Sequence, residues 1–193
     1  QVTAGVYAYL PLGYRVLRKA ENIIEEEMDN INVPEMIMPH LLPATLWQES
    51  GRYKKYGAEM FKLQDRHGRE SLLGPTHEET FTEIVAKNLK SYKQMPLALY
   101  QIQTKFRDEN RPRFGLLRGR EFVMLDGYSF AATREQLDEQ FDDQKSAYLK
   151  IFNRAGVTVH PVIADSCTMG GKNSTEFQAP AAIGEDTIAT NEK

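Results

Sequence analysis

The residues best suited to chemistry lie in one arginine-rich segment, residues 105–122. It contains three acidic residues against six basic ones, which are Lys105, Arg107, Arg111, Arg113, Arg118 and Arg120. A guanidinium group can donate two parallel hydrogen bonds to the oxygens of one phosphate, so this composition indicates an anionic ligand. The alternative is a charged loop that is simply solvated.

Four residues of this segment have the types that a purine nucleotide needs. Arg107 could contact a phosphate through a charge-assisted hydrogen bond, which contributes about 1.5–3 kcal/mol. Glu109 could accept a hydrogen bond from an exocyclic amine. Phe122 could stack on the base, for roughly 1–3 kcal/mol, and Arg118 supplies a second cation. In the alternative interpretation, Phe122 belongs to the core and Arg107 pairs with a structural acid.

A second group, Thr76-His77-Glu78, stands where a helix is expected to begin. Thr76 with Glu79 three residues later fits a capping box, which would give both residues a purely structural role. In the functional interpretation, Glu78 lies in the first helical turn, faces a pocket and binds a cation such as an amino group.

Several familiar sites are excluded by spacing. The pair His77-Glu78 begins like a zinc-protease helix, but the position of the second histidine is Phe81. A phosphate-binding P-loop needs Ser or Thr where Asn173 stands. The four histidines and the single cysteine, Cys167, show no metal-ligand spacing, and we expect Cys167 to be a packed or loop residue. We therefore predict no metal-ligating residues.

The composition is that of a globular protein with one sizeable core. Hydrophobic residues make up 41% and charged residues 26% of the 193 residues, and the net charge is −3. Any nucleic-acid contact must therefore come from a local basic patch. One cysteine excludes an internal disulfide, and no apolar run reaches the length of a membrane span.

The elements that must position these residues are predicted from periodicity. Residues 97–106 and 120–130 read as two strands joined by a long loop that contains Pro112 and Gly115. Further strands are expected at residues 33–39, 61–63, 71–73 and 157–165. Another strand should follow a glycine-containing turn at 169–173, and residues 183–193 also read as a strand. Residues 51–57 are expected to form a loop. Strands that cluster as hairpins between helices predict an α+β fold with a mainly antiparallel sheet.

Four helices are expected between these strands. The first two cover about residues 14–30 and 43–50, and the third begins at Thr76. The fourth runs from Thr133 to about Gly156, and Gln136 would complete a capping box at its start. Helical spacing predicts the buried side chains Leu17, Ala20, Ile24, Ile31, Phe81, Ile84, Val85, Leu89, Leu137, Phe141, Tyr148 and Phe152.

The motifs resemble a known family. FRDE at residues 106–109 followed by RGREF at 118–122 resembles motif 2 of the class II aminoacyl-tRNA synthetases. Together with GPTHEE, SYKQMPL, LWQESGRYKKYG and MGGKNSTEF, it resembles the bacterial-type prolyl-tRNA synthetases over nearly the whole chain. Motif 1 would cover about residues 13–39 and motif 2 about residues 97–130.

The resemblance implies a fold, a reaction and a set of roles. The fold would be the class II antiparallel sheet flanked by helices, and the reaction would join L-proline to tRNA(Pro) through prolyl-adenylate, using ATP and Mg²⁺. Arg107 would hold the α-phosphate and the proline carboxylate. ATP would also be bound by Glu109, Arg118, Gly119 and Phe122, and the imino group of proline by Thr76 and Glu78. A cytoplasmic homodimer formed through the motif 1 region would be expected.

The resemblance also implies which parts of such an enzyme would lie outside residues 1–193. Residues 1–193 would be the N-terminal part of the catalytic domain and would end where an editing insertion begins, so that motif 3 and the anticodon-binding domain lie outside. We expect this part alone to be inactive. Two alternatives remain: a non-enzymatic class II relative that binds nucleic acid or regulates, and a synthetase for another amino acid.

Overall fold

A computed structural model describes residues 1–164 and 174–189 of the chain. Its helices and strands are α1 (Pro11–Asn30), β1 (Leu41–Pro43), α2 (Ala44–Glu49), α3 (Arg52–Lys55), β2 (Lys62–Gln64), β3 (Glu70–Leu73), α4 (Glu78–Asn88), β4 (Leu97–Phe106), β5 (Glu121–Phe130), α5 (Arg134–Arg154), β6 (His160–Ile163) and β7 (Thr175–Gln178). Short 3₁₀ turns lie at Gly57–Glu59, Tyr92–Gln94 and Gly115–Leu117. No helix in the described part of the chain has the length and apolarity that a membrane crossing requires.

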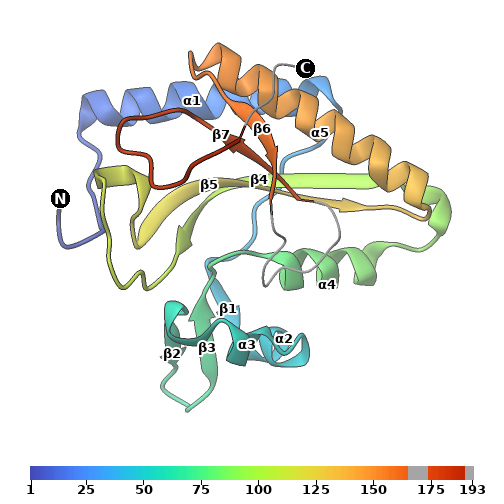
Figure 1. Cartoon of the computed structure of the whole chain (residues 1–193). Helices are drawn as coiled ribbons and strands as arrows, with labels where there is room; N and C mark the ends of the chain where they lie inside the picture. The colour runs from blue at the N-terminus through green and yellow to red at the C-terminus, as the bar shows by residue number, and fades with distance from the viewer. Residues whose placement is uncertain (165–173, 190–193) are drawn as a thin grey trace.

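The centre of the molecule is the antiparallel hairpin of β4 and β5. The two strands pair without interruption from Leu97 opposite Phe130 to Phe106 opposite Glu121. The long helices α1 and α5 lie on one side of this hairpin, and α4 lies on the other (Figure 1). The predicted α+β fold with antiparallel pairing is confirmed, because every ladder between the described strands is antiparallel.

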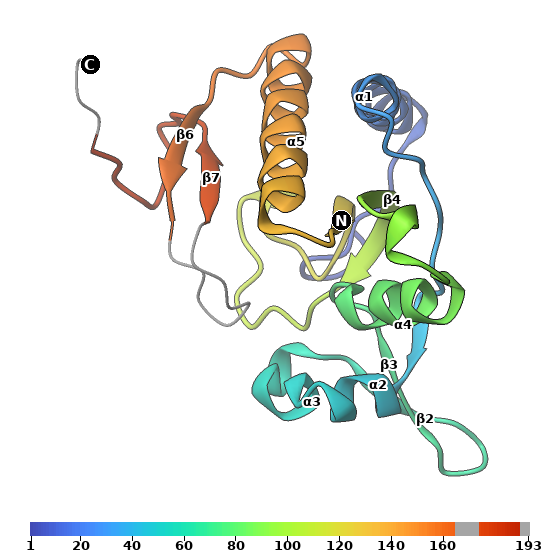
Figure 2. The same cartoon turned by 90° about the vertical axis from the view of Figure 1, so that its right-hand side faces the viewer.

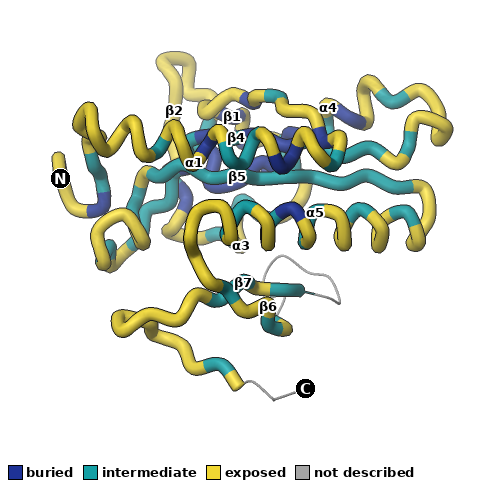
Figure 3. Tube along the Cα trace, turned by 90° about the horizontal axis from the view of Figure 1, so that it is seen from above, coloured by how far each residue is buried: buried dark blue, intermediate teal, exposed yellow. Residues whose placement is uncertain are grey.

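Two apolar clusters hold these elements in place. Beside the central hairpin, Tyr100 packs with Met28 and Val33, and Ile24 and Leu125 complete the contact. Burial is greatest along β4, while the outer turns of α1 and α5 are exposed (Figure 3). The hairpin of β6 and β7 lies on the side of α5 that faces away from α1 (Figure 2).

The second cluster stabilises the small sheet of β1, β3 and β2. Trp47 of α2 is fully buried and packs with Leu42, Met60 and Leu72. The strands pair in the order β1-β3-β2, which confirms the predicted hairpin at residues 61–73. This unit carries α3 and the entry to α4, so it sets where the Thr76–Glu78 segment begins.

Two secondary-structure predictions, a strand and a loop, are wrong. Residues 33–39 form no regular strand, but only an isolated parallel bridge between Glu35 and Tyr100. Pro34 and Pro39 carry no N–H to continue a ladder, and the side chain of Gln101 accepts from Met38 N instead. Residues 51–57 are not a loop throughout, because α3 begins directly after Gly51, which has a φ of +74°.

The two predicted capping boxes also differ from the structure. His77, rather than Thr76, is the N-cap residue of α4, and it makes no side-chain capping bond. Thr133 does cap α5 by accepting from Gln136 N at 3.3 Å, but the Gln136 side chain accepts from Ala132 N instead of Thr133 N. The first box is wrong, and the second lacks its reciprocal bond.

Some side chains predicted to be buried are exposed. The exposed set comprises Ala20, Ile84, Leu137 and Phe141. On α5 the only fully buried side chain among the described residues is Ala147, because the helix turns Gln144 and Ala147 toward the hairpin. Residues 183–189 form no strand, whereas Cys167 and the turn at 169–173 lie outside the described residues.

Candidate active site

The base of the arginine-rich loop brings the predicted nucleotide residues together. The β4–β5 ladder ends at the pair of Phe106 and Glu121, and Arg107 N then donates to Arg120 O at 2.9 Å. This closure places both ends of the loop beside each other. Among the described residues, a cavity of about 460 Å³ is lined by Glu59, Arg107, Glu109, Leu116, Leu117, Arg118, Gly119, Phe122 and Val123. All five residues assigned to ATP from the sequence therefore line one cavity.

Arg107 is only partly engaged by the protein. One of its terminal nitrogens donates to Pro75 O at 3.3 Å, and its guanidinium carbon lies 5.3 Å from the centroid of the Phe122 ring. Its Nε is buried and has no hydrogen-bond partner among the described residues. Since a buried unpaired donor is unfavourable, this side chain suits an anionic ligand.

Glu109 and Arg118 form an ion pair across the loop base, with 2.8 Å between Arg118 Nε and Glu109 Oε2. The Arg111 backbone N–H and then Arg118 lower the pKa of Glu109, while Glu109 raises the pKa of Arg118. Both groups are therefore charged near neutral pH. Since the Arg118 side chain is 48% exposed, it can turn toward a ligand.

Gly119 is held by the N-terminal segment. Arg120 N donates to Gly5 O at 2.7 Å, and a Cβ at Gly119 would lie 2.9 Å from the same carbonyl oxygen. Only glycine fits such a close approach of two backbones. The N-terminal segment, which precedes α1, thus supports the loop from behind.

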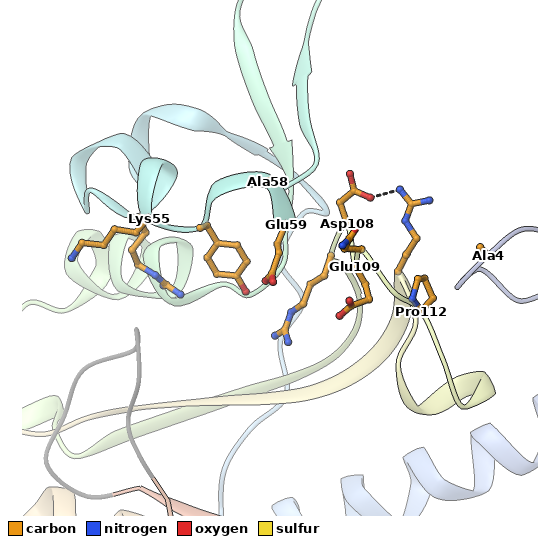
Figure 4. Close-up of a pocket in the computed structure, with 12 residues that line it drawn as sticks. Ala4, Lys55, Ala58, Glu59, Asp108, Glu109 and Pro112 are labelled. Carbon is orange, nitrogen blue, oxygen red and sulfur yellow. Dashed lines mark hydrogen bonds and ion pairs between the residues drawn. The ribbon is translucent and has the colours of Figure 1, made fainter. Parts of the chain in front are cut away.

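A larger cavity of about 1110 Å³ lies next to the first (Figure 4). Glu59, Arg107 and Glu109 line both cavities. The larger one also receives Arg52, Tyr56 and the ion-paired side chains Asp108 and Arg120. Burial raises the pKa of Tyr56, which therefore remains a neutral hydroxyl.

Thr76 and Glu78 are brought together, but not within the cavity of Arg107. Thr76 Oγ1 donates to Glu78 Oε2 at 2.7 Å, and Arg52 Nη1 lies 3.0 Å from the same carboxylate oxygen. Glu78 lines a separate open cavity of about 600 Å³, and Arg52 lines both that cavity and the larger one. The link between the two groups is the hydrogen bond from Arg107 to Pro75 O.

Not every cation of the arginine-rich segment is available to an anionic ligand. Lys105 is fully buried and pairs with Asp126 at 2.8 Å. Arg113 pairs with Glu185 at 2.6 Å, and Arg120 pairs with Asp108. Because these three cations already have acidic partners, they are less free for an anionic ligand than their number in the sequence indicates.

Sequence reasoning missed Arg52, which contacts Glu78 and Glu79 and lies 4.9 Å above the Trp47 ring. The motif LWQESGRYKKYG contained it, but a loop was expected there. Sequence reasoning also missed the buried polar side chains of the central hairpin, described below. Among the described residues, no group of three or more His, Cys, Asp or Glu could hold a metal ion.

Comparison with known proteins links this geometry to one group of enzymes. The family model described as tRNA synthetase class II core domain (G, H, P, S and T) matches residues 61–190. The chain is 99% identical over 193 residues to a proline–tRNA ligase of Lactobacillus gasseri, covering 100% of this chain and 34% of that protein. It is 62% identical over 189 residues to that of Limosilactobacillus reuteri, covering 98% and 33% respectively. The chain thus spans about a third of the length of these curated relatives.

Solved structures share the fold. A Giardia lamblia prolyl-tRNA synthetase in complex with prolyl-adenylate superposes with a TM-score of 0.78 at 23% identity, over 84% of this chain and 34% of that one. A Cryptosporidium parvum prolyl-tRNA synthetase with halofuginone and AMPPNP gives a TM-score of 0.81 at 18% identity, over 92% and 36%. At these identities the likeness establishes the fold, and the predicted class II architecture is confirmed.

Proposed function

The chain belongs to the class II tRNA synthetase core family, and from this premise we propose that it forms the ATP- and proline-binding part of a proline–tRNA ligase. The observation that carries the proposal is the loop base, where Arg107, Glu109, Arg118, Gly119 and Phe122 line one cavity. The high identity to curated proline–tRNA ligases supports the choice of amino acid.

In the proposed reaction, a carboxylate oxygen of proline attacks the α-phosphorus of ATP. A bond forms between them, the bond to the β-phosphate oxygen breaks, and pyrophosphate leaves. The nucleophile is already ionised, so no general base is needed. Arg107 holds the α-phosphate and the carboxylate, and it neutralises the charge that develops between them. A ribose hydroxyl at the 3′ end of tRNA(Pro) then attacks the carbonyl carbon, and AMP leaves.

The remaining loop residues would bind the nucleotide. Glu109 and the backbone at Gly119 would read the adenine, and Arg118 would contact the phosphates. Arg118 has to give up part of its ion pair with Glu109 to do so, which its exposure permits. Adenine would stack on the Phe122 ring, so the Arg107 guanidinium must leave that face or the base must use the opposite one.

Thr76 and Glu78 would hold the secondary ammonium group of proline. Glu78 offers the negative charge, and the hydroxyl of Thr76 is bonded to it at 2.7 Å. Arg52 already pairs with Glu78, so proline and Arg52 would share one carboxylate. The ring of proline offers only apolar area, and such pockets distinguish ligands by about 1–3 kcal/mol per methylene.

Magnesium and a second subunit complete the proposal. Mg²⁺ would accompany the phosphates of ATP, and no residue of this chain is assigned to it. A cytoplasmic homodimer would use the motif 1 region at about residues 13–39. Several apolar side chains in this region, or directly before it, are 53–76% exposed. They are Leu10, Leu12, Tyr14 and Val16. These side chains support a subunit contact, since large apolar groups gather where surfaces are covered.

The test is proline-dependent exchange of pyrophosphate into ATP by the full-length protein that carries this chain. Arg107→Ala should lower the exchange rate at least about 100-fold, as expected when a donor to the developing charge is removed. Arg66→Ala, an exposed arginine on the β2–β3 turn, is the matched control and should retain activity. Near-normal exchange in Arg107→Ala would contradict the proposal.

A panel of amino acids in the same assay tests the substrate. Proline should support the highest rate. If threonine or another amino acid were preferred, the chain would belong to a different synthetase. If no amino acid supported exchange while the protein bound RNA, the alternative of a non-enzymatic relative would be favoured.

A further inference from the structure

A buried polar network lies beneath the Thr76–Glu78 segment and has no assigned role. It consists of His77, Lys105, Asp126 and Tyr128, here called the Lys105 network. Lys105 and His77 have no exposed surface, and the Asp126 side chain is 9% exposed. Lys105 lies on β4, while Asp126 and Tyr128 lie on β5. The network therefore joins the central hairpin to the first residues of α4.

Lys105 is at the centre of the network. Its Nζ lies 2.8 Å from Asp126 Oδ1, 2.8 Å from His77 Nδ1 and 3.1 Å from Gln103 Oε1. An ammonium group has three N–H donors and no acceptor, so these contacts use all of them. Apart from the ion pair with Lys105, Asp126 Oδ1 has no hydrogen-bond partner among the described residues. Lys105 thus provides the only polar contact of Asp126 Oδ1 in the described part of the chain, whereas Oδ2 also accepts from Gln101.

The state of His77 follows from these contacts. Since Lys105 can only donate, His77 Nδ1 accepts, and Nε2 carries the proton that is donated to Pro39 O at 3.0 Å. Burial lowers the pKa of His77, and the neighbouring Lys105 adds to this. The ring is therefore neutral and fixed at both nitrogens.

Tyr128 connects the network to the backbone of the candidate proline site. Its hydroxyl accepts from His77 N at 2.9 Å and donates to Asp126 Oδ2 at 2.5 Å. The same hydroxyl lies 3.5 Å from Thr76 Oγ1. Phe81 of α4 stacks on the Tyr128 ring at 4.2 Å. The first turn of α4 is thus fixed by side chains of the hairpin, in place of an N-cap side chain.

Such a network contributes little net stability. Removing two charges from water offsets most of what their attraction contributes, and an apolar replacement of similar shape is often as stable. What a fully satisfied network does provide is one defined arrangement of the groups attached to it. Here these groups are the backbone of His77 and, on either side of it, Thr76 and Glu78.

We propose that the Lys105 network is a positioning device that holds Thr76 and Glu78 in the geometry that binds the secondary ammonium group of proline. The inference rests on the proposed function and deepens it, because it names residues that act on the substrate only through Thr76 and Glu78. Lys105, Asp126 and Tyr128 are then determinants of amino-acid binding, not of ATP binding.

The test compares Tyr128→Phe with Tyr100→Phe in the full-length protein by pyrophosphate exchange. Both variants remove one hydroxyl from a tyrosine of the central hairpin, and the Tyr100 hydroxyl takes no part in the network. The stacking of Phe81 on ring 128 is kept. Tyr128→Phe should raise the KM for proline about fivefold or more, while kcat and the KM for ATP stay within about twofold. Tyr100→Phe should leave all three unchanged.

A second variant, Lys105→Met, keeps an unbranched side chain that is one atom shorter and removes its charge. It should weaken proline binding more than Tyr128→Phe does, because it leaves Asp126 Oδ1 and His77 Nδ1 without a polar partner, while Tyr128 and Gln101 still donate to Asp126 Oδ2. If Lys105→Met fails to fold, Tyr128→Phe still decides the question.

The outcomes separate this inference from the proposed function. An unchanged KM for proline in Tyr128→Phe, or equal losses for proline and ATP, would overturn the inference while the enzyme remains a proline–tRNA ligase. An absence of proline-dependent exchange in the unmodified protein would overturn the proposed function, and the inference with it.

Discussion

At the scale of single residues, the basic side chains of one segment serve two purposes. Arg107 forms no ion pair with an acidic side chain among the described residues, and Arg118 is half exposed, so both can receive a ligand. Lys105 and Arg120 come from the same segment, yet they are committed to Asp126 and Asp108. Arg107 can therefore bind a ligand without losing an ion pair, whereas Arg118 would have to exchange part of its ion pair with Glu109 for the ligand.

His77 leads to a prediction on pH. Burial lowers its pKa below the usual value of 6.5, so the folded protein binds fewer protons there than the unfolded chain. Its contribution to stability is complete above pH 6.5 and is lost as the pH falls through the folded pKa. We expect the free energy of unfolding to decline from about pH 6.5 downward, as measured by urea denaturation.

The matched variants for this prediction are His77→Gln and His67→Gln. A glutamine amide can accept from Lys105 and donate to Pro39 O, but it does not titrate. His77→Gln should flatten the decline between about pH 6.5 and 5, whereas His67→Gln, on the exposed β2–β3 turn, should not. The same slope in both variants would show that His77 is not the group responsible.

At the scale of elements, the β4–β5 hairpin decides the site because its register fixes where the loop begins and ends. Ten residue pairs place Arg107 directly after one strand and Arg120 directly before the other. A shift by one residue would turn every side chain to the opposite face of the sheet. The N-terminal segment completes the arrangement through the contact of Gly5 with Arg120 N.

Gly5→Ala should disturb nucleotide binding at a distance. Gly5 has a φ of +73°, and a Cβ there would lie 2.9 Å from Arg120 Cγ and from Pro112 Cβ. We expect a KM for ATP several-fold higher and a loss of about 1–3 kcal/mol in stability. Gly68→Ala is the control, since its φ is +78° and the nearest atom is 3.9 Å away. Equal changes in KM for both variants would rule out a specific contact at Gly5.

The tip of the loop should act on a different substrate from its base. Arg111 is exposed and Arg113 is held by Glu185, so neither lines the smaller cavity at the loop base. Neutralising both as Arg111→Gln with Arg113→Gln should lower tRNA charging about tenfold or more, since each phosphate contact adds to RNA affinity. Pyrophosphate exchange should change much less. Equal losses in the two assays would show that tip and base do not have separate roles.

At the scale of the whole molecule, several large apolar side chains are exposed in the part of the chain that the structure describes. Leu10 and Leu12 are 74% and 76% exposed, and Phe141 on the outer side of α5 is 44% exposed. The chain also spans about a third of the length of its curated relatives.

Residues 1–193 on their own should not catalyse proline-dependent exchange. The cavities at the loop base are open, and rate in this chemistry comes from holding two substrates in line within a closed arrangement. The measurement compares this segment with the full-length protein at equal concentration. Activity of the segment close to that of the full-length protein would show that the described residues suffice.

The sequence alone determined the hairpin, the loop and the group at its base. Alternating residues and a long polar interruption specify two paired strands, and local spacing then places Arg107 and Phe122 at their ends. It also determined the antiparallel α+β class. These features depend on neighbours in the chain, which a sequence displays directly.

Only the tertiary structure decided which polar residues are buried and what they contact. Lys105 and Asp126 are 21 residues apart in sequence and meet because the two strands pair, and His77 joins them from the N-cap position of α4. Thr76 is bonded to Glu78, although its spacing to Glu79 fitted a cap. Such contacts depend on where distant segments pack, and a local pattern holds no information on that packing.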